Sequence, residues 1–260
     1  MAWGHMRTIA VVNQKGGVGK TTTTVNLGHA LALQGKRVML VDLDPQGHLS
    51  LCLGLYRAPH EGIDSVLLDG QPLQGKAVST RELLSLVPAG DKLGEFEQIE
   101  GGAERGNILR SAIQQAALDV DYLIFDCPPS AGLLVVNAVL AADDVLVPVT
   151  GDYLSLTGLA KLMVTIQRIE GLRDSPLKKW IFLSRYVARR SLSEEVRDKI
   201  LQHFPEHLLS AHIREAAVLT ECAGVGRSIF EYRAKSKSAE EFRTLADDLL
   251  QGKLVASDKE

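Results

Sequence analysis

The chain has 260 residues, of which 45% are hydrophobic and 23% are charged, and its formal net charge is −3. This balance favours one soluble α/β domain, or at most two small ones, and excludes a strong overall attraction to nucleic acid or to an anionic membrane. The 3 cysteines and 7 histidines are widely scattered, and no apolar run approaches about 18 residues. These features exclude a disulfide scaffold, a cysteine-rich metal site and a transmembrane helix.

Segments typical of buried strands alternate with helical segments along the whole chain. Strands are expected at 7–12, 37–44, 85–90, 121–129, 143–150, 180–186 and 208–213. Helices are expected at 20–34, 106–118, 132–141, 156–169, 193–203 and 238–251. The stretch 89–107 is rich in Gly and Glu and is expected to be an exposed connection. Continuous apolar strands separated by helices predict an α/β fold with a mostly parallel sheet and helices on both faces. Ligands bind such sheets at the carboxyl ends of the strands.

The expected domain boundaries lie close to the two ends of the sequence. Residues 1–6, MAWGHM, are expected to be an expression scar before a native start at Met6, or to be disordered, so the domain is expected to begin at residue 7. A single nucleotide-binding domain is expected over 7–251, followed by a tail over 252–260.

The first expected strand leads into NQKGGVGKTTTT, residues 13–24, a glycine-rich turn that opens a helix. Glycines let the backbone bend so that several N–H groups point at one anion, and the helix N-terminus adds its dipole. In a phosphate loop of this kind the lysine reaches the β- and γ-phosphates and the next hydroxyl binds Mg²⁺; these roles fall to Lys20 and Thr21. The loop departs from the usual pattern, because position 14 is Gln and Lys15 is a second lysine. The candidate nucleotide-binding residues are Lys15, Gly16, Gly17, Val18, Gly19, Lys20, Thr21 and Thr22.

Carboxylates follow two further strands, where a bound Mg²⁺–nucleotide would need them. Asp126 ends YLIFD and occupies the place of a Walker-B aspartate, which holds Mg²⁺ directly or through water. Asp42 and Asp44 end VMLVDLD, so one of them can touch the water shell of the metal while the other orients the attacking water. The predicted metal site comprises Thr21, Asp42 and Asp126. An aspartate at a strand end can instead be a simple turn residue.

The segment VVNQKGGVGKTTTTVNLGHALALQGKRVMLVDLDPQGHLS resembles the ParA family of partition and positioning ATPases. The segments DYLIFDCPPSAGLLVVNAVLAADDVLVPV and GDYLSLTGLAKL resemble the same family, and the similarity extends over residues 7–251. ParA belongs to the deviant Walker A class, which also contains MinD and the nitrogenase iron protein. The NQKGG form is closer to ParA than to MinD.

The resemblance implies a role for each matching residue. Lys15 would be the signature lysine, which reaches across a nucleotide-sandwich homodimer to ATP bound by the other subunit, and Lys20 would bind phosphates in its own subunit. Asp44 would position the hydrolytic water, and Asp126 would be the Walker-B acid. The implied cofactors are ATP and Mg²⁺, and the candidate catalytic residues are Lys15 and Asp44. A positive charge completed only on dimerisation would stabilise the transition state as an arginine finger does.

One segment departs clearly from the family pattern. Where ParA proteins often read IPRNxRLSEAP, this chain reads IREAAVLTECA over 213–223, which puts the usual adenine and DNA contacts of that segment in doubt. Arg214 is the candidate to replace one of them and is included among the nucleotide-binding residues. Asp152 stands where the family usually has Glu. These departures suggest a specialised branch that positions a cargo other than a chromosome.

Basic residues in the C-terminal third are the candidate DNA contacts. The resemblance implies sequence-independent DNA binding by the ATP dimer, and Arg189 matches an arginine linked to DNA binding in the family. Phosphate contacts of this type give salt-dependent affinity that does not read base sequence. Such side chains, with acidic neighbours, are also often simply solvated. The candidates are Arg189, Arg190, Arg233, Lys235 and Lys237.

The leading hypothesis is a cytoplasmic, nucleoid-associated ATPase that segregates a chromosome or plasmid through a ParB-like partner, with hydrolysis that is weak alone and stimulated by partner and DNA. Its main alternative positions a carboxysome or a chemoreceptor cluster through an adaptor. A MinD-like membrane ATPase is disfavoured, because the helix expected at 238–251 has an acidic polar face where membrane binding needs a basic one. Ser238 and Glu241 are expected to form the capping box of that helix. A metallocluster carrier would need paired cysteines, and Asp44 disfavours a non-hydrolysing scaffold.

Overall fold

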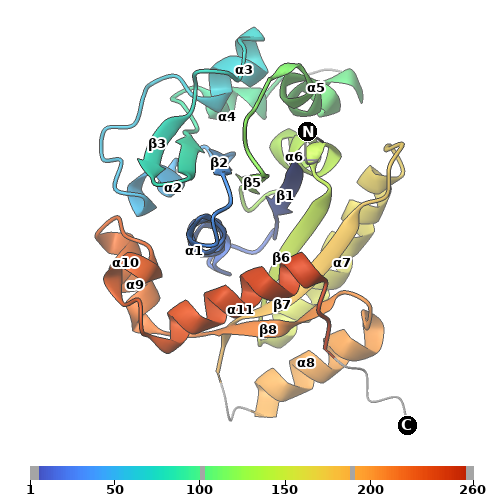
Figure 1. The fold of residues 1–260 in the computed structure, drawn as a ribbon. Helices are drawn as coiled ribbons and strands as arrows, with labels where there is room; N and C mark the ends of the chain where they lie inside the picture. The colour runs from blue at the N-terminus through green and yellow to red at the C-terminus, as the bar shows by residue number, and fades with distance from the viewer. Residues whose placement is uncertain (1–5, 100–102, 188–190, 256–260) are drawn as a thin grey trace.

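The computed structural model describes residues 6–99, 103–187 and 191–255. Within them, the strands are β1 (Arg7–Val11), β2 (Val38–Asp42), β3 (Val78–Arg81), β4 (Leu84–Val87), β5 (Tyr122–Asp126), β6 (Asp144–Thr150), β7 (Lys178–Tyr186) and β8 (Leu208–Arg214). They form one eight-stranded sheet in the order β3-β4-β2-β5-β1-β6-β7-β8 (Figure 1). Neighbouring strands run parallel, except that β3 and β4 form an antiparallel hairpin at one edge.

Helices cover both faces of this sheet (Figure 1). One face carries α3 (Ile63–Asp69), α4 (Leu93–Phe96), α5 (Ile108–Gln115), α6 (Leu133–Ala141), α7 (Tyr153–Glu170) and α8 (Ser191–His203), with the 3-10 turn η1 (Ala103–Asn107) before α5. The other face carries α1 (Lys20–Leu33), α2 (His48–Cys52), α9 (Ala217–Gly224), α10 (Ile229–Tyr232) and α11 (Lys237–Gln251). None of the helices in the described residues has both the length and the apolar character that a bilayer crossing requires.

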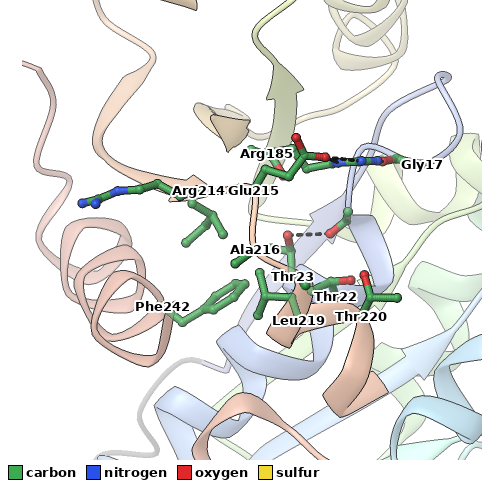
Figure 2. Close-up of a pocket in the computed structure, with 14 residues that line it drawn as sticks. Gly17, Thr22, Thr23, Arg185, Arg214, Glu215, Ala216, Leu219, Thr220 and Phe242 are labelled. Carbon is green, nitrogen blue, oxygen red and sulfur yellow. Dashed lines mark hydrogen bonds and ion pairs between the residues drawn. The ribbon is translucent and has the colours of Figure 1, made fainter. Parts of the chain in front are cut away.

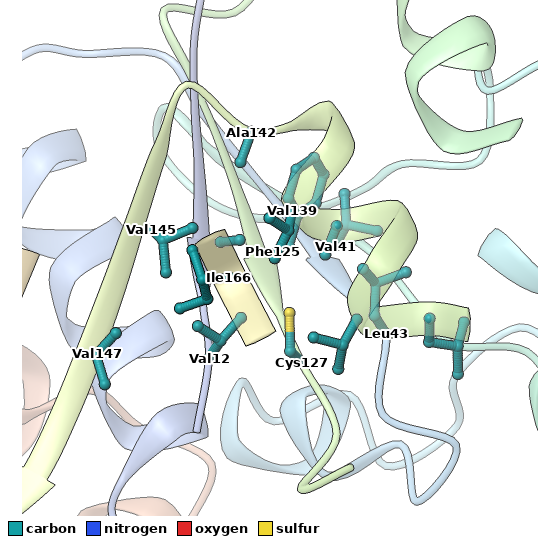
Figure 3. Close-up of a cluster of buried hydrophobic side chains, with 14 of the residues drawn as sticks. Val12, Val41, Leu43, Phe125, Cys127, Val139, Ala142, Val145, Val147 and Ile166 are labelled. Atoms are coloured by element: carbon teal, nitrogen blue, oxygen red, sulfur yellow. The ribbon is translucent and has the colours of Figure 1, made fainter. Parts of the chain in front are cut away.

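Two apolar cores result, one on each face, because successive side chains of a strand point to opposite sides of the sheet. Ile9 of β1 packs into the core under α1 and α11, whereas its neighbour Ala10 packs into the core under α3–α8. Figure 3 shows part of the second core, where Val41, Phe125 and Val139 meet beneath α6. The central strands are thus buried on both sides, which explains their nearly continuous apolar sequences.

The register of the parallel strands brings three strand ends to one edge of the sheet. Val11 of β1 aligns with Asp126 of β5, and Asp42 of β2 aligns with the same residue. The loop after β1 and the carboxylates that end β2 and β5 are therefore neighbours, although they are far apart in sequence. This is the edge at which ligands of parallel sheets bind.

The predicted fold class is confirmed, and the expected strands and helices are all present with shifts at their ends. The sequence did not indicate β3 or the short helices α2, α3, α4, α9 and α10. These helices have four to eight residues, too few turns for a helical period to become visible. The strand β3, VSTR, is partly exposed along its length and shows no alternation of buried and exposed positions.

The expectation of an exposed connection over 89–107 is wrong for its central part. Leu93 and Phe96 on α4 are fully buried in the core. The next residue, Glu97, accepts hydrogen bonds from the N–H groups of Leu133 (2.8 Å) and Leu134 (3.3 Å), so its carboxylate caps the start of α6. Two apolar anchors and one capping carboxylate are easily hidden in a composition dominated by Gly and Glu.

The expected capping box of the last helix is also wrong. The N-cap of α11 is Ser236, whose side chain accepts a hydrogen bond from Ala239 N at 3.2 Å. Ser238 lies inside the helix and is buried. Glu241 does not reach back to the cap but pairs with Arg214, with 2.9 Å between Oε1 and Nε.

The two ends of the described chain contribute to the fold beyond the expected boundaries. Met6, the expected native start, packs against the core under α3–α8. Within the expected tail, Lys253 O accepts from Ser210 N at 3.2 Å, and Val255 N donates to Leu208 O at 2.9 Å. Residues 253–255 therefore pair with β8 along the edge of the sheet.

Phe96 tests the packing of α4. Replacing this fully buried side chain by Ala should lower the free energy of unfolding by about 3–5 kcal/mol, because a large apolar group is removed and a cavity is left. Leu154→Ala is the matched control: Leu154 is 79% exposed, so the decrease should stay below about 0.5 kcal/mol. Chemical denaturation measures both variants, and a similarly small decrease in both would contradict the buried position of α4.

Candidate functional site

The loop between β1 and α1 has the backbone of a phosphate loop. Gly17 and Gly19 have φ values of +73° and +91°, in the left-handed region that favours glycine. Gly19 is the N-cap of α1, and in the described residues no side chain caps this helix and no acidic residue lies in its first turn. The first N–H groups of α1 are therefore available to an anion.

The carbonyl groups of the same loop are held from the side of β7. Ser184 Oγ donates to Val18 O at 2.8 Å, and Arg185 Nη1 donates to Gly17 O at 3.0 Å. The C=O and N–H groups of one trans peptide point in opposite directions. Holding these two carbonyls therefore turns the N–H groups of Val18 and Gly19 away from β7.

Lys20 lies against the loop and is only 7% exposed. Its Nζ donates a long hydrogen bond of 3.4 Å to Lys15 O. Burial lowers the pKa of Lys20, while the negative charge of nearby Asp126 acts in the opposite direction. A buried ammonium with so weak a partner is well suited to a phosphate oxygen, since charge-assisted hydrogen bonds are strong.

Asp126 ends β5 near Lys20 and is fully buried. Burial raises the pKa of Asp126 to about 7, although hydrogen bonds from Thr21 and Thr24 and the charge of Lys20 partly oppose this rise. Its Oδ1 accepts from Thr24 Oγ1 at 3.2 Å, whereas Oδ2 is buried with no hydrogen-bond partner among the described residues. A buried, unsatisfied carboxylate oxygen is costly unless a cation or a donor pairs with it, so Asp126 fits a magnesium site.

Side chains alone do not form a metal cage here. Among residues 6–99, 103–187 and 191–255, no three His, Cys, Asp or Glu side chains converge on a point that could hold a metal ion. Mg²⁺ is usually bound by one or two carboxylates together with waters and substrate phosphates. Asp126 and Thr21 therefore fit Mg²⁺ only in combination with the oxygens of a bound phosphate.

Asp42 and Asp44 lie in different environments. Asp42 is fully buried, and its two oxygens accept from the N–H groups of Asp44 (3.1 Å) and Leu49 (3.2 Å). Burial and the charge of Asp126 raise the pKa of Asp42 well above its ordinary value, against the effect of these hydrogen bonds. Asp44 is partly exposed, and its Oδ1 accepts from Gln46 N at 3.0 Å. In this structure Asp42 organises the turn after β2, and its place in the metal site stays a prediction.

Lys15 is held by its own chain at the rim of the site. Its Nζ lies 2.8 Å from Asp152 Oδ2 and donates to Ser155 Oγ at 3.1 Å. Burial alone would raise the pKa of Asp152, but hydrogen bonds from Lys15, Thr150 and Ser155 outweigh it and lower this pKa to about 2. The side chain of Lys15 is 41% exposed, so the ion pair remains accessible from outside.

Comparisons with known proteins match this chain to a family. A family model described as an AAA domain matches residues 6–179. The chromosome partitioning protein ParA of Caulobacter vibrioides is 38% identical over 258 residues, which cover 96% of each chain. The chain belongs to the ParA family.

Two of the solved structures that are similar to this ParA-family chain contain nucleotides. One is the crystal structure of cobyrinic acid a,c-diamide synthase from Mycobacterium smegmatis with bound ADP and magnesium. Its sequence is 34% identical to this chain, the TM-score is 0.81, and the match covers 95% of each chain. A complex of McdA from Cyanothece with ATP has a TM-score of 0.83 at 20% identity, with coverage of 98% of this chain and 100% of that chain. The second likeness shows the fold alone.

The segment in which this chain departs from the ParA pattern, 213–223, lines a cavity of about 390 Å³ beside the phosphate loop. Figure 2 shows the side chains of Leu219 and Phe242 in its wall and the guanidinium of Arg214 directed away from Gly17. That guanidinium is the one paired with Glu241. A nucleotide contact by Arg214 stays a prediction, and it would require this side chain to move.

The candidate DNA contacts of the ParA-family chain fall into two groups. Arg189 and Arg190 lie outside the described residues. Arg233 and Lys235 lie in the short connection from α10 to α11, and Lys237 follows at the start of α11; all three are exposed. Lys237 is the first residue of α11, where the helix dipole disfavours a positive charge. Helix stability therefore does not explain this lysine, and phosphate contact remains the prediction for the group.

Some residues at the site were not apparent from the sequence. Ser184 and Arg185 hold the phosphate loop, and Glu215, after β8, pairs with Arg185. Their contacts with the loop join positions 166 and 168 residues apart, so no local motif marks them. Glu215 lies in the segment that departs from the ParA pattern, which is the one signal that could have indicated it.

The Lys15–Asp152 pair predicts a measurable titration. The ordinary pKa of an aspartate is about 3.9, whereas that of folded Asp152 is lowered to about 2. The stability that this carboxylate contributes is therefore complete above about pH 4 and is lost as the pH falls through about 2. NMR titration of the side-chain carboxyl should give a midpoint near 2 in the wild type and a higher midpoint in Lys15→Gln, because a hydrogen-bonded positive charge is removed.

The matched control is Lys161→Gln, which changes an exposed lysine on α7 and should leave the midpoint unchanged. A wild-type midpoint near 4, or no rise in Lys15→Gln, would contradict the pair.

Proposed function

We propose that this ParA-family chain is an ATPase that dimerises with ATP, binds DNA without sequence preference and positions a cargo. The supporting observation is that one phosphate loop carries two lysines in opposite environments. Lys20 is 7% exposed, whereas the side chain of Lys15 is 41% exposed. A buried lysine suits phosphates bound within its own subunit, and a lysine at the rim suits phosphates presented by a second subunit.

ATP with Mg²⁺ is the proposed ligand. The N–H groups of Val18 and Gly19 and the ammonium of Lys20 would bind the β- and γ-phosphates. Thr21 and Asp126 would hold Mg²⁺, which neutralises phosphate charge when bound. The unsatisfied Oδ2 of Asp126 supports this assignment, and so does the similar M. smegmatis protein, which was crystallised with ADP and magnesium.

Hydrolysis is proposed to require a second subunit. Asp44, partly exposed after β2, would accept a hydrogen bond from the attacking water and orient it. Lys15 would leave Asp152 and place its ammonium against the transferred phosphate of ATP in the other subunit, where it stabilises the charge that develops. The ion pair with Asp152 would hold Lys15 within its own subunit in the isolated chain, so we expect hydrolysis by the chain alone to be weak.

We propose that the protein acts in the cytoplasm while bound to nucleoid DNA. Arg233, Lys235 and Lys237 offer exposed positive charge over a five-residue stretch, 233–237, to DNA phosphates; Arg189 and Arg190 are the second proposed group. The relative from C. vibrioides is named a chromosome partitioning protein, which favours a chromosome or plasmid cargo and a ParB-like partner. A non-DNA cargo bound through an adaptor is the alternative.

Asp44→Ala and Lys20→Ala should separate hydrolysis from binding. Asp44→Ala should retain ATP affinity but lose about 100-fold or more in turnover, because the attacking water is no longer oriented, and should accumulate as an ATP dimer. Lys20→Ala should lose ATP binding itself, since the buried charge on the phosphates is removed. Calorimetry, phosphate release and light scattering measure the three properties, with Lys161→Ala as control. Normal turnover in Asp44→Ala would remove Asp44 from the catalytic role, and ATP binding by Lys20→Ala would reject the phosphate site.

Replacing Arg233, Lys235 and Lys237 together by Ala should weaken DNA binding by the ATP dimer. The slope of log K against log salt should become shallower by about 0.9 for each DNA phosphate that the protein no longer neutralises. The matched control neutralises three other exposed basic residues, Lys161, Arg168 and Lys178. Binding is measured by fluorescence anisotropy over a range of salt concentrations. An unchanged slope in the first variant, or an equal change in both, would reject this patch.

A further inference from the structure

Two successive residues at the end of β7 both reach the phosphate loop. Side chains that follow one another in a strand normally point to opposite faces, yet Ser184 binds the carbonyl of Val18 and Arg185 binds the carbonyl of Gly17. The backbone explains this, because Arg185 has φ = +51° and the pairing of β7 with β8 shifts register between Ser184 and Tyr186. The left-handed residue turns the second side chain back toward the loop.

This conformation is unfavourable for a residue with a side chain, and it persists only where the surroundings enforce it. Two hydrogen-bond acceptors enforce it here by fixing the guanidinium of Arg185. Arg185 donates to Gly17 O at 3.0 Å from Nη1, and to Glu215 Oε1 at 3.2 Å from Nε and 2.5 Å from Nη2. Glu215 is anchored in turn, because its N–H donates to Tyr186 O at 3.1 Å. Figure 2 shows the guanidinium lying between Glu215 and Gly17.

The three linked residues separate two cavities. The larger one, about 390 Å³, is lined by the segment after β8 and the start of α1. The smaller one, about 250 Å³, contains Lys15 and Asp152 at the rim. Gly17, Arg185 and Glu215 line both cavities and form the partition between them. A ligand that spans the larger cavity and the phosphate loop would therefore lie against this link.

We infer that Arg185 is a positioning residue, which holds Gly17 so that the loop presents its N–H groups to phosphate and which ties the loop through Glu215 to the wall of the larger cavity. The inference rests on the proposed nucleotide site. The guanidinium acts on phosphate binding through the orientation of the peptide between Gly17 and Val18. Glu215 contributes by fixing the guanidinium, so its negative charge favours the binding of an anion.

The sign of the Glu215 effect separates positioning from direct contact. If Arg185 simply attracted phosphates, removing the nearby carboxylate would free its positive charge and strengthen anion binding. If Arg185 acts by holding the loop, removing the carboxylate loosens the guanidinium and weakens anion binding. The variant Glu215→Gln keeps the shape of the side chain and removes only its charge.

The experiment titrates the full chain with two magnesium-containing ligands, ATP and inorganic tripolyphosphate, the second of which has no base. Arg185→Met should lower the affinity for both ligands about five- to tenfold, because a charge-assisted hydrogen bond to the loop is removed at a partly exposed site. Glu215→Gln should lower both affinities about threefold. The double variant should lose less than the product of the two single effects, since both act on one link. Arg185→Lys, which can reach only one acceptor at a time, should be intermediate.

Two controls locate the effect. Leu219→Ala changes the wall of the larger cavity away from the contacts of Arg185. It should lower the affinity for ATP but not the affinity for tripolyphosphate. Arg168→Met removes an exposed arginine on α7 and should change neither affinity. Thermal unfolding without ligand identifies any variant that fails to fold; if Arg185→Met does so, Arg185→Lys and Glu215→Gln decide the question.

Unchanged affinities in Arg185→Met, or tighter binding in Glu215→Gln, would overturn the inference while leaving the nucleotide site intact. Loss of ATP affinity alone, with normal tripolyphosphate binding, would make Arg185 a base contact and would overturn it as well. A wild-type chain that binds neither ligand would reject the nucleotide site and this inference together.

Discussion

A phosphate loop that points its N–H groups at an anion must point the carbonyl groups of the same peptides away from it. In this chain the carbonyls of Val18 and Gly17 are held by Ser184 and Arg185 of a strand that is two places away from β1 in the sheet. The loop therefore depends on the sheet being complete as far as β7. That requirement links the glycine-rich motif near the start of the chain to residues far along the sequence.

The same edge of the sheet contains three buried ionisable side chains. Asp42, Asp126 and Lys20 are each no more than 7% exposed. Taking such groups out of water is unfavourable unless each finds a partner. Asp42 satisfies both of its oxygens with backbone N–H groups, whereas Asp126 leaves one oxygen without a partner among the described residues. Asp42 therefore completes the turn after β2 within the chain itself. The free oxygen of Asp126 instead needs a bound ligand or ion to pair with it.

The sequence was sufficient to predict the alternating strands and helices, and it marked the phosphate loop and the aspartates after β2 and β5. Those features depend on local composition and on the parallel order of the strands. The partner of Lys15, the direction of Arg214 and the contact of Arg185 depend instead on side-chain interactions between segments more than 25 residues apart in sequence. Phe96 was missed for another reason: one buried ring in a stretch rich in Gly and Glu has no periodicity to reveal it.

The fold is shared by proteins whose names describe different tasks, a chromosome partitioning protein and a diamide synthase among them. Function is carried by sites and not by the fold as a whole. The contacts that matter for this chain are accordingly small ones, such as the link between Arg185 and Glu215, which both line the two cavities beside the loop.

The strand-like pairing of residues 253–255 with β8 has a practical meaning for work with this protein. An uncovered edge strand offers unpaired N–H and C=O groups to any other chain and invites aggregation. Lys253 and Val255 occupy part of that edge. A fluorescent or affinity tag is therefore better joined after the last residue than in place of this short segment. Truncation after Gly252 would remove the hydrogen bonds of residues 253–255 and expose this edge of β8.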